Sequence, residues 1–160
     1  MEIYILRHGI AEEAKGADSE RALTQDGKKK LREVLRLARE LEVAPALILT
    51  SPYKRALETA ELAADVLGSK EPLVTTEALV PTAAPEDVWH EIRTYKNVDD
   101  LMVVGHEPLL SSVIGFLLGD LSLQIDLKKG GLTRVTVDQF GPQPRGTLKW
   151  LLPPKVALAG

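Results

Sequence analysis

Short apolar runs alternate with longer helical patterns along most of the chain. Glu2–Leu6, Ala46–Leu49 and Leu101–Val104 are almost wholly apolar, as expected of strands that are covered on both faces of a parallel sheet. Leu73–Thr76 is a weaker candidate of the same kind. The pattern therefore predicts a sheet whose central strands are buried on both sides.

The segments between these runs have the spacing of amphipathic helices. In the first helix the apolar residues recur at intervals of three, four and seven: Leu31, Val34, Leu35, Ala38 and Leu41. A second helix carries its apolar stripe from Ala56 to Leu67. We predict that Ser51 caps this helix and that Pro52 is its first helical residue, since both types favour those positions.

The second half of the chain predicts two further helices and a pair of strands. The helices cover Pro85–Arg93 and the segment from Pro108 to about Leu118. Leu132–Val137 and Thr147–Leu152 are strand-like and are joined by a segment rich in Gly and Pro, so we expect an antiparallel pair at the far end of the sheet. The alternation predicts a three-layer α/β/α sandwich with a mostly parallel central sheet and an antiparallel edge.

Length and charge narrow the picture further. The 160 residues fit one domain, and no repeat or linker interrupts residues 1–160. The net charge is −3 with no long basic face, which argues against nucleic acid as a partner. The three lysines Lys28, Lys29 and Lys30 are interpreted as a solvated helix face. No apolar run approaches the roughly 20 residues that cross a bilayer, which argues against a membrane protein.

The absence of cysteine and the residues at the start of the chain both indicate the cytoplasm. The chain has no cysteine, which excludes disulfides, thiol nucleophiles and thiolate metal sites. Glu2 stands where a signal peptide carries positive charge, and Arg7 interrupts the first apolar run. We therefore expect a cytoplasmic protein.

Polar residues follow three of the predicted strands directly. Arg7 and His8 come after the first strand, and His106 comes after the run Leu101–Val104. The segment after the second strand places Arg55 in the first turns of the next helix. Because ligands bind beyond the carboxyl ends of the strands in such sheets, we expect these side chains to meet at one rim. Two of the three histidines in the chain lie at equivalent strand-to-helix junctions.

Phosphoryl transfer is the chemistry that suits this set. The guanidinium groups of Arg7 and Arg55 pair with phosphate oxygens. A neutral imidazole attacks phosphorus when its other nitrogen is held, and a protonated imidazole stabilises charge in the transition state. His8 and His106 can divide these two roles.

Other polar residues have simpler interpretations. Ser51 is expected to cap a helix rather than to act as a nucleophile, because no G-x-S-x-G motif surrounds it. Glu107 caps its helix or orients His106, and the sequence does not separate the two. His90 is expected on a surface or half-buried helix position, and Trp89 in the core.

Metal and nucleotide sites have little support. The chain has three histidines and no H-E-x-x-H motif, so zinc hydrolysis is disfavoured. Neither a Walker motif nor G-x-G-x-x-G is present. We therefore expect no metal and no cofactor.

Several motifs resemble those of the histidine phosphatase superfamily, which has the phosphoglycerate mutase-like fold. They are "LRHG", "LTSPYKRALETAE" and "VVGHEP", in that order. "SERALTQDG", "GGLTRVTV" and "LKWLLPP" further resemble the SixA-type phosphohistidine phosphatases. The resemblance covers nearly the whole chain. It implies a phosphatase in which a histidine is transiently phosphorylated.

Carried over to this chain, the resemblance implies a role for each motif residue. His8 is the nucleophile, His106 is the second active-site histidine, and Arg7 and Arg55 bind the phosphoryl group. The resemblance also makes Arg21 a further phosphate contact. Gly9 fits this picture as a binding position, because a side chain there would crowd the approach of the backbone to the anion.

The expected substrate is phosphohistidine on a protein, such as a histidine phosphotransfer domain. In the mutase branch of the superfamily a Glu after the third strand protonates the leaving group, and a long insertion covers the substrate. Glu77 occupies a similar place, but it is equally interpreted as a solvated turn residue. The stretch from Glu77 to His106 leaves no room for such a lid. The alternatives are a small-molecule phosphomonoesterase of the same superfamily, or a non-catalytic phosphate-binding module.

Overall fold

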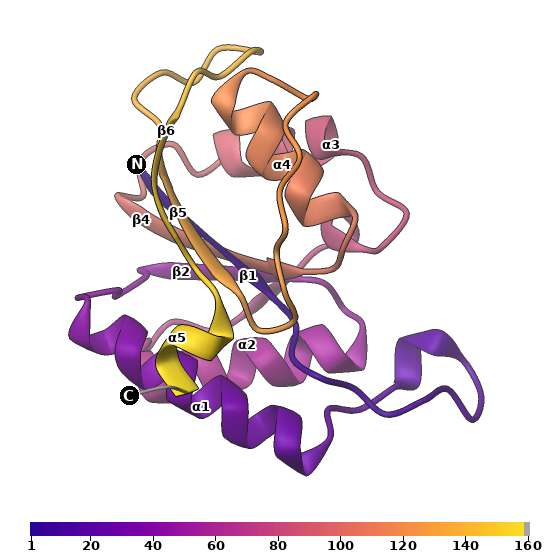
Figure 1. Ribbon diagram of the computed structural model, residues 1–160. Coiled ribbons are helices and arrows are strands. Elements are labelled where there is room, and N and C mark those ends of the chain that lie inside the picture. Colours follow the sequence, from indigo (N-terminus) through magenta and orange to yellow (C-terminus); the bar gives the residue numbers. More distant parts are fainter. Residues whose placement is uncertain (159–160) are drawn as a thin grey trace.

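A six-stranded sheet runs through the middle of the molecule, with strand order β3-β2-β4-β1-β5-β6 (Figure 1). The fold is taken from a computed structural model that describes residues 1–158. The last two residues of the predicted 1–160 domain lie outside the described residues. The strands are β1 (Glu2–Arg7), β2 (Leu47–Thr50), β3 (Val74–Thr75), β4 (Asp100–Gly105), β5 (Leu132–Thr136) and β6 (Thr147–Leu152).

The four strands β1 to β4 are parallel, and the other two form an antiparallel edge. β4 lies between β1 and β2, and β2 also pairs with β3. β5 is antiparallel to β1 and to β6. The predicted mostly parallel sheet with an antiparallel edge is therefore confirmed.

Helices cover both faces of the sheet, which confirms the three layers (Figure 1). One face carries α1 (Gln25–Glu40), α2 (Lys54–Leu67) and the short α5 (Pro154–Leu158). The other carries α3 (Pro85–Arg93) and α4 (Leu109–Leu118).

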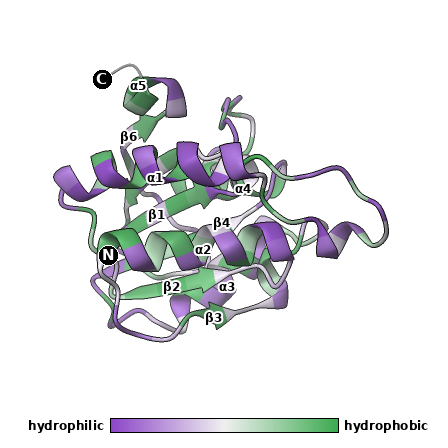
Figure 2. Ribbon diagram, turned by 90° about the horizontal axis from the view of Figure 1, so that it is seen from below, coloured by the Kyte–Doolittle hydropathy of each residue, from purple (hydrophilic) through white to green (hydrophobic). Residues whose placement is uncertain are grey.

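Alternate residues of the central strands supply the two halves of the core. In β1, Ile3 and Ile5 pack with residues of α3 and α4, whereas Tyr4 and Leu6 pack with residues of α1 and α2. Figure 2 shows the central strands as mostly hydrophobic, whereas α1 and α2 in front of them carry both hydrophilic and hydrophobic residues. The continuous apolar runs of the sequence are explained by this burial on both faces.

Most predicted elements are present, but α2 begins later than predicted. Its first residue is Lys54, and Tyr53 occupies the N-cap position without a side-chain cap. Ser51 instead accepts a hydrogen bond from the Tyr53 N–H and contacts His106, so the expected capping role is wrong. The first helix also starts earlier than its apolar stripe, at Gln25, where Thr24 accepts a hydrogen bond from the Gly27 N–H.

The connection between β5 and β6 is held against α3. The buried Trp89 stacks on Phe140, and its indole N–H donates to the Gly141 carbonyl at 2.9 Å. His90 is exposed on the same helix, as predicted for both residues. Among the helices of residues 1–158, none has the length and apolar character needed to cross a membrane.

Candidate active site

The carboxyl ends of three neighbouring parallel strands meet at one rim of the sheet. In the register of the sheet Arg7 lies opposite Gly105, and Thr50 lies opposite Val104. The N–H of His8 donates to the Gly105 carbonyl at 3.0 Å, so the ladder continues one residue beyond β1. The residues that follow β1, β4 and β2 therefore emerge side by side.

This register brings the two predicted histidines together. The ring centroids of His8 and His106 are 5.2 Å apart, and the ring planes are inclined by 56°. The two side chains and Arg55 are almost buried, with His8 6%, His106 2% and Arg55 5% exposed. The sequence placed these three side chains at one rim, and the structure brings them together there.

The hydrogen bond of His8 determines which of its nitrogens is available. His8 Nδ1 lies 2.7 Å from the carbonyl oxygen of Gly9. A carbonyl only accepts hydrogen bonds, so Nδ1 carries the proton and Nε2 keeps its lone pair. The neutral ring is thus held in the tautomer that a nucleophile needs.

His106 is held by different partners. Its Nε2 lies 2.8 Å from the Ser51 hydroxyl, while its Nδ1 is buried without a partner among the described residues. The ring of Tyr53 packs edge-on against the imidazole, with centroids 5.2 Å apart. The guanidinium of Arg55 lies over the same Tyr53 ring at 5.2 Å, so one aromatic side chain positions both residues.

Both imidazoles are neutral at pH 7 in the free protein. Burial, helped by the nearby cations Arg55 and Arg7, lowers the pKa of His8 to about 4 against the opposing Gly9 hydrogen bond. Burial and the neighbouring His8 lower the pKa of His106 to about 3. Both rings are neutral without a ligand because the rim is desolvated and already positively charged, and protonation of His106 in the transition state stays a prediction.

The two arginines keep donors that no described residue uses. Arg7 donates from Nη1 to the Leu127 carbonyl at 2.9 Å, and its Nε is buried without a partner. Arg55 donates from Nη1 to the Asp18 carbonyl at 2.9 Å and pairs through Nη2 with the Asp18 carboxylate at 3.1 Å. Its Nε is also buried without a partner. Unused buried donors on cations are what an anion site offers.

Asp18 links Arg55 to Arg21, the third arginine predicted to contact phosphate. Arg21 donates from Nη1 to the Asp18 carboxylate at 3.2 Å and from Nε to the Glu12 carbonyl at 2.7 Å. Asp18 belongs to the 3-10 turn η1 (Asp18–Glu20), in the long connection from β1 to α1 (Figure 1). Arg21 thus lies in the network of the rim through Asp18, and its direct contact with a phosphate stays a prediction.

Gly9 has a packing constraint that was not predicted. A Cβ at this position would lie 2.6 Å from Cδ1 of Leu31 in α1, so a side chain would collide with the helix. The Gly9 N–H donates to the Thr59 hydroxyl at 3.2 Å. The close approach that requires glycine is therefore to α1, and a binding role for Gly9 stays a prediction.

The two glutamates near the rim, Glu107 and Glu77, have different surroundings. Glu107 accepts a hydrogen bond from the Ser111 N–H at 2.6 Å and another from its hydroxyl, which decides between the alternatives in favour of capping α4. Glu77 begins the 3-10 turn η2 (Glu77–Leu79) and is exposed. Its segment reaches the rim because the Thr76 N–H donates to the Thr50 carbonyl.

Four residues that contact or influence the site were not predicted from the sequence. Asp18 and Thr59 contact the rim from a loop and from the second turn of α2. Lys129 lowers the pKa of His8 by its charge, although it lies far along the chain. Tyr53 and Thr59 are both part of the segment "LTSPYKRALETAE", so that motif could have indicated them. Within residues 1–158 no group of three or more His, Asp or Glu side chains is arranged to hold a metal ion.

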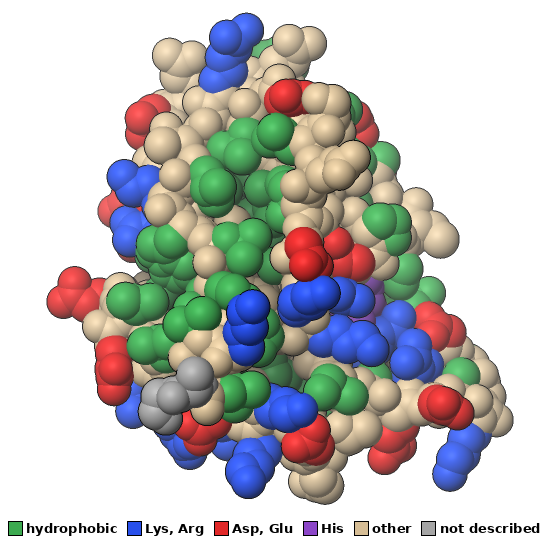
Figure 3. Space-filling view, viewed as in Figure 1, with side chains coloured by type: hydrophobic (Ala, Val, Ile, Leu, Met, Phe, Trp, Pro, Cys, Tyr) green, Lys and Arg blue, Asp and Glu red, His purple; other side chains and the backbone are tan. Residues whose placement is uncertain are grey.

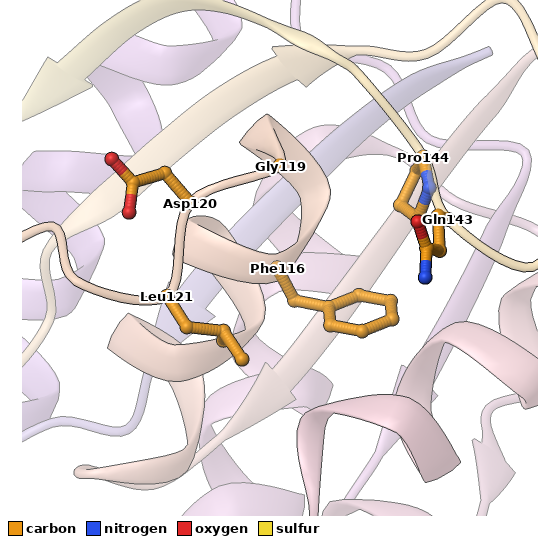
Figure 4. Close-up of a pocket in the computed structure, with 6 residues that line it drawn as sticks. All are labelled: Phe116, Gly119, Asp120, Leu121, Gln143 and Pro144. Atoms are coloured by element: carbon orange, nitrogen blue, oxygen red, sulfur yellow. The ribbon is translucent and has the colours of Figure 1, made fainter.

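A separate hollow of about 270 Å³ lies away from this rim (Figure 4). It is lined by Phe116, Gly119, Asp120, Leu121, Gln143 and Pro144. These residues gather at the carboxyl end of α4, whereas His106 precedes its amino end. The lining contains no cation, so the hollow is a poor candidate for an anion site.

Comparison with known proteins gives consistent matches. The family model of the histidine phosphatase superfamily (branch 1) matches residues 3–81. The phosphohistidine phosphatase SixA of Escherichia coli (strain K12) is 26% identical, covering 96% of this chain and 94% of that protein. An uncharacterised protein of Picosynechococcus sp. is 32% identical, covering 82% of each.

A solved structure of the protein histidine phosphatase SixA in complex with tungstate has the same fold. It superposes with a TM-score of 0.87 at 25% sequence identity, covering 98% of this chain and 99% of that one. The strand order, the two adjacent histidines and the similarity to these relatives all indicate the same family. The chain belongs to the histidine phosphatase superfamily and is of the SixA type.

Proposed function

We propose that this protein hydrolyses phosphohistidine on another protein through a covalent intermediate on His8. The observation that carries the proposal is the hydrogen bond of 2.7 Å between His8 Nδ1 and the Gly9 carbonyl. It leaves Nε2 unprotonated, next to a second imidazole and to arginines with unused donors. We place the protein in the cytoplasm, as its sequence suggests.

Binding of the phosphoryl group is assigned to Arg7 and Arg55. Their free donors pair with its oxygens, and the anion takes the place of the Asp18 carboxylate on Arg55. A dianion beside His106 raises the pKa of that imidazole from about 3, which favours its protonation only when substrate is bound. A protonated His106 then stabilises the negative charge that develops on the transferring group.

The reaction has two displacements at phosphorus. The lone pair of His8 Nε2 forms a bond to phosphorus while the bond from phosphorus to the substrate nitrogen breaks and its electron pair returns to that nitrogen. The substrate imidazole leaves as a neutral ring when its other nitrogen already carries a proton. Water then attacks the phosphohistidine on His8, releasing phosphate and restoring the free imidazole.

The relatives support this assignment. The E. coli relative is named a phosphohistidine phosphatase, and the solved SixA structure holds tungstate, a tetrahedral oxyanion like phosphate. The short connection between Glu77 and His106 holds only η2, α3 and β4, so no long insertion covers the rim there. We propose a phosphorylated protein, such as a histidine phosphotransfer domain, as the partner.

A panel of substrates tests the proposal. We expect kcat/KM to be highest for a phosphohistidine protein, lower for an aryl phosphate and lowest for a sugar phosphate. His8→Ala should abolish all three activities, while the matched control His90→Ala, on an exposed helix position, should retain them. Activity should persist in EDTA. Full activity of His8→Ala would overturn the proposal.

A small-molecule phosphomonoesterase is the second candidate, and one observation favours it. Glu77 is exposed at the start of η2, which is bonded to the end of β2, so its carboxyl group is free to protonate an alkoxide. A sugar phosphate that proves the best substrate would favour this candidate. Phosphate-dependent thermal stabilisation with no turnover of any substrate would favour a non-catalytic phosphate-binding module.

A further inference from the structure

A wide groove adjoins the candidate active site on the side of α1 and α5. It has a volume of about 680 Å³ and is built from segments far apart in the sequence: the residue after the β1 turn, α1, the loop before β5, the end of β6, and α5. We call it the lysine groove. None of the roles assigned above to the rim residues uses it.

The edge of the lysine groove is strongly basic. Lys30, Lys128, Lys129 and Lys155 line it, against the single carboxylate of Asp126. This local excess of cations stands in a chain whose net charge is −3. Lys30 and Lys128 are paired only with exposed carboxylates of their own segments, and in residues 1–158 neither Lys129 nor Lys155 forms an ion pair. Exposed pairs of this kind are weak, so all four ammonium groups can engage an anionic partner.

The lining between the lysines is apolar. Ile10, Leu151, Pro153, Pro154 and Leu158 contribute to it, and Leu158 is 43% exposed. Figure 3 shows this arrangement on one face of the molecule: Lys and Arg side chains gather beside a His side chain, and hydrophobic side chains lie next to them over α5 and the end of β6. An apolar centre with a charged rim is the usual anatomy of a protein interface.

The groove is continuous with the site around His8. A small cavity of about 20 Å³ shares Ile10, Lys30 and Lys129 with the groove and is also lined by Gly9. The N–H of Gly130, next to Lys129, donates to the carbonyls of Arg7 and His8. The loop that carries two of the lysines is therefore hydrogen-bonded directly to the nucleophile's segment.

We propose that the lysine groove is the docking surface for the phosphorylated protein, and that it selects partners whose phosphohistidine is surrounded by acidic and apolar side chains. The inference rests on the proposed function. A single phosphoryl group is already provided for by Arg7 and Arg55, so four further cations around an apolar floor serve a larger anionic surface. Charge complementarity raises the association rate and selects the partner.

The test compares two charge-reversed variants. Lys128→Glu/Lys155→Glu changes the groove, and the matched control Lys70→Glu/Lys96→Glu makes the same change in net charge at exposed positions outside it. Lys129 is left intact because its charge acts on His8. The probes are two synthetic phosphohistidine peptides of equal length, one flanked by Glu and Leu and one by Lys and Leu, together with p-nitrophenyl phosphate.

The wild type should hydrolyse the acidic peptide with a kcat/KM about tenfold above that of the basic peptide at low salt, and salt should reduce the difference. The groove variant should lose this preference while its activity on p-nitrophenyl phosphate changes less than about twofold. The control variant should keep the preference.

Three results would overturn the inference while leaving the proposed function standing. They are equal use of both peptides by the wild type, an equal loss on p-nitrophenyl phosphate in the groove variant, and groove-dependent sedimentation of the protein with phosphatidylserine vesicles. The second would make the groove part of the phosphate site, and the third would assign it to an anionic lipid surface. Absence of hydrolysis of every probe by the wild type would instead refute the proposed function.

Discussion

Charged side chains lie at both the amino ends and the carboxyl ends of the central strands, but the hydrogen-bond partners of these side chains differ between the two ends. At the amino end of β1, Glu2 accepts hydrogen bonds from the Arg134 Nε and the Thr136 hydroxyl, each at 2.7 Å. At the carboxyl end, Arg7 and Arg55 retain buried donors without a partner. A paired ion in a sheet is a structural feature, whereas a surplus of buried donors marks a place prepared for an anion.

The difference also appears in the ionisation of the two ends. At the amino end burial acts to raise the pKa of Glu2, but its hydrogen bonds to Thr136 and Arg134 outweigh burial and lower it. At the carboxyl end burial lowers the pKa of both histidines, and no nearby carboxylate reverses the shift. At the amino end the protein's own side chains stabilise the charge, whereas at the candidate active site a bound anion would stabilise the charges.

Removing an arginine should give the largest difference in activity between the carboxyl and amino ends of the strands. Arg55→Ala and Arg7→Ala should each lower kcat/KM for an aryl phosphate by at least about 100-fold, because each removes a charge-assisted donor from the transferring group. Lys at either position should not restore the rate fully, since it lacks the bidentate fork.

Arg134→Ala is the matched control at the other end of the sheet. It should leave kcat/KM within about twofold and lower the free energy of unfolding by about 1 kcal/mol, as for a partly exposed pair. Near-normal rates in Arg55→Ala, or a large loss in Arg134→Ala, would place the phosphate site elsewhere.

The buried histidines should make the protein sensitive to acid. Their folded-state pKa values of about 4 and about 3 lie below the ordinary value of 6.5, so the unfolded chain takes up protons first as the pH falls. Their contribution to stability is complete above about pH 6.5 and is lost on the way down to those values. At pH 5 each histidine should cost on the order of 2 kcal/mol.

Urea unfolding at pH 7.5 and pH 5 measures this effect. His106→Gln should have a smaller loss of stability between the two pH values than the wild type, and His90→Gln should behave like the wild type because its side chain is exposed. An unchanged pH dependence in His106→Gln would mean that this imidazole is not held neutral by burial.

Asp18 tests whether the phosphate position is occupied by the protein's own carboxylate. Asp18→Asn should tighten inhibition by inorganic phosphate by about twofold to fivefold, because an ion pair whose carboxylate is exposed to solvent contributes up to about 1 kcal/mol. The same change should leave the Ki of an uncharged ligand unaltered. Weaker phosphate inhibition in Asp18→Asn would indicate that Asp18 positions Arg55 instead of competing for it.

Glu77 should give the smallest effect. Glu77→Gln should change kcat/KM for a phosphohistidine substrate by less than about twofold, since an imidazole leaves without an external acid. The Glu107→Gln variant is a useful comparison, because its cap on α4 should affect stability before activity. A selective loss on alkyl phosphates in Glu77→Gln would support the small-molecule alternative.

The features that could be predicted from sequence are those set by local pattern. The buried strands were visible as apolar runs, and the parallel arrangement brought His8, Arg55 and His106 to one rim. The contact of Asp18 with Arg55 was not predictable, because it depends on how a long loop folds back over 37 positions of the chain.

The capping role of Ser51 was mispredicted for the same reason, long-range packing. Ser51 looked like a helix cap locally, but the neighbouring strand brings His106 within 2.8 Å of its hydroxyl. The burial that lowers the pKa of His106 to about 3 in the free protein is likewise not visible in the sequence, and protonation of His106 in the transition state stays a prediction. The closeness of Gly9 to Leu31 of α1 also depends on long-range packing, and the predicted contact of Gly9 with the anion stays a prediction.

The most direct test of the central claim is to trap the phosphorylated enzyme. The protein is mixed with a phosphohistidine substrate and quenched at alkaline pH within one turnover, and its peptides are analysed by mass spectrometry. The account predicts one phosphoryl group on His8, absent in His8→Ala and unaffected in His90→Ala. Turnover with no phosphoryl group on His8, or with the group on His106, would contradict it.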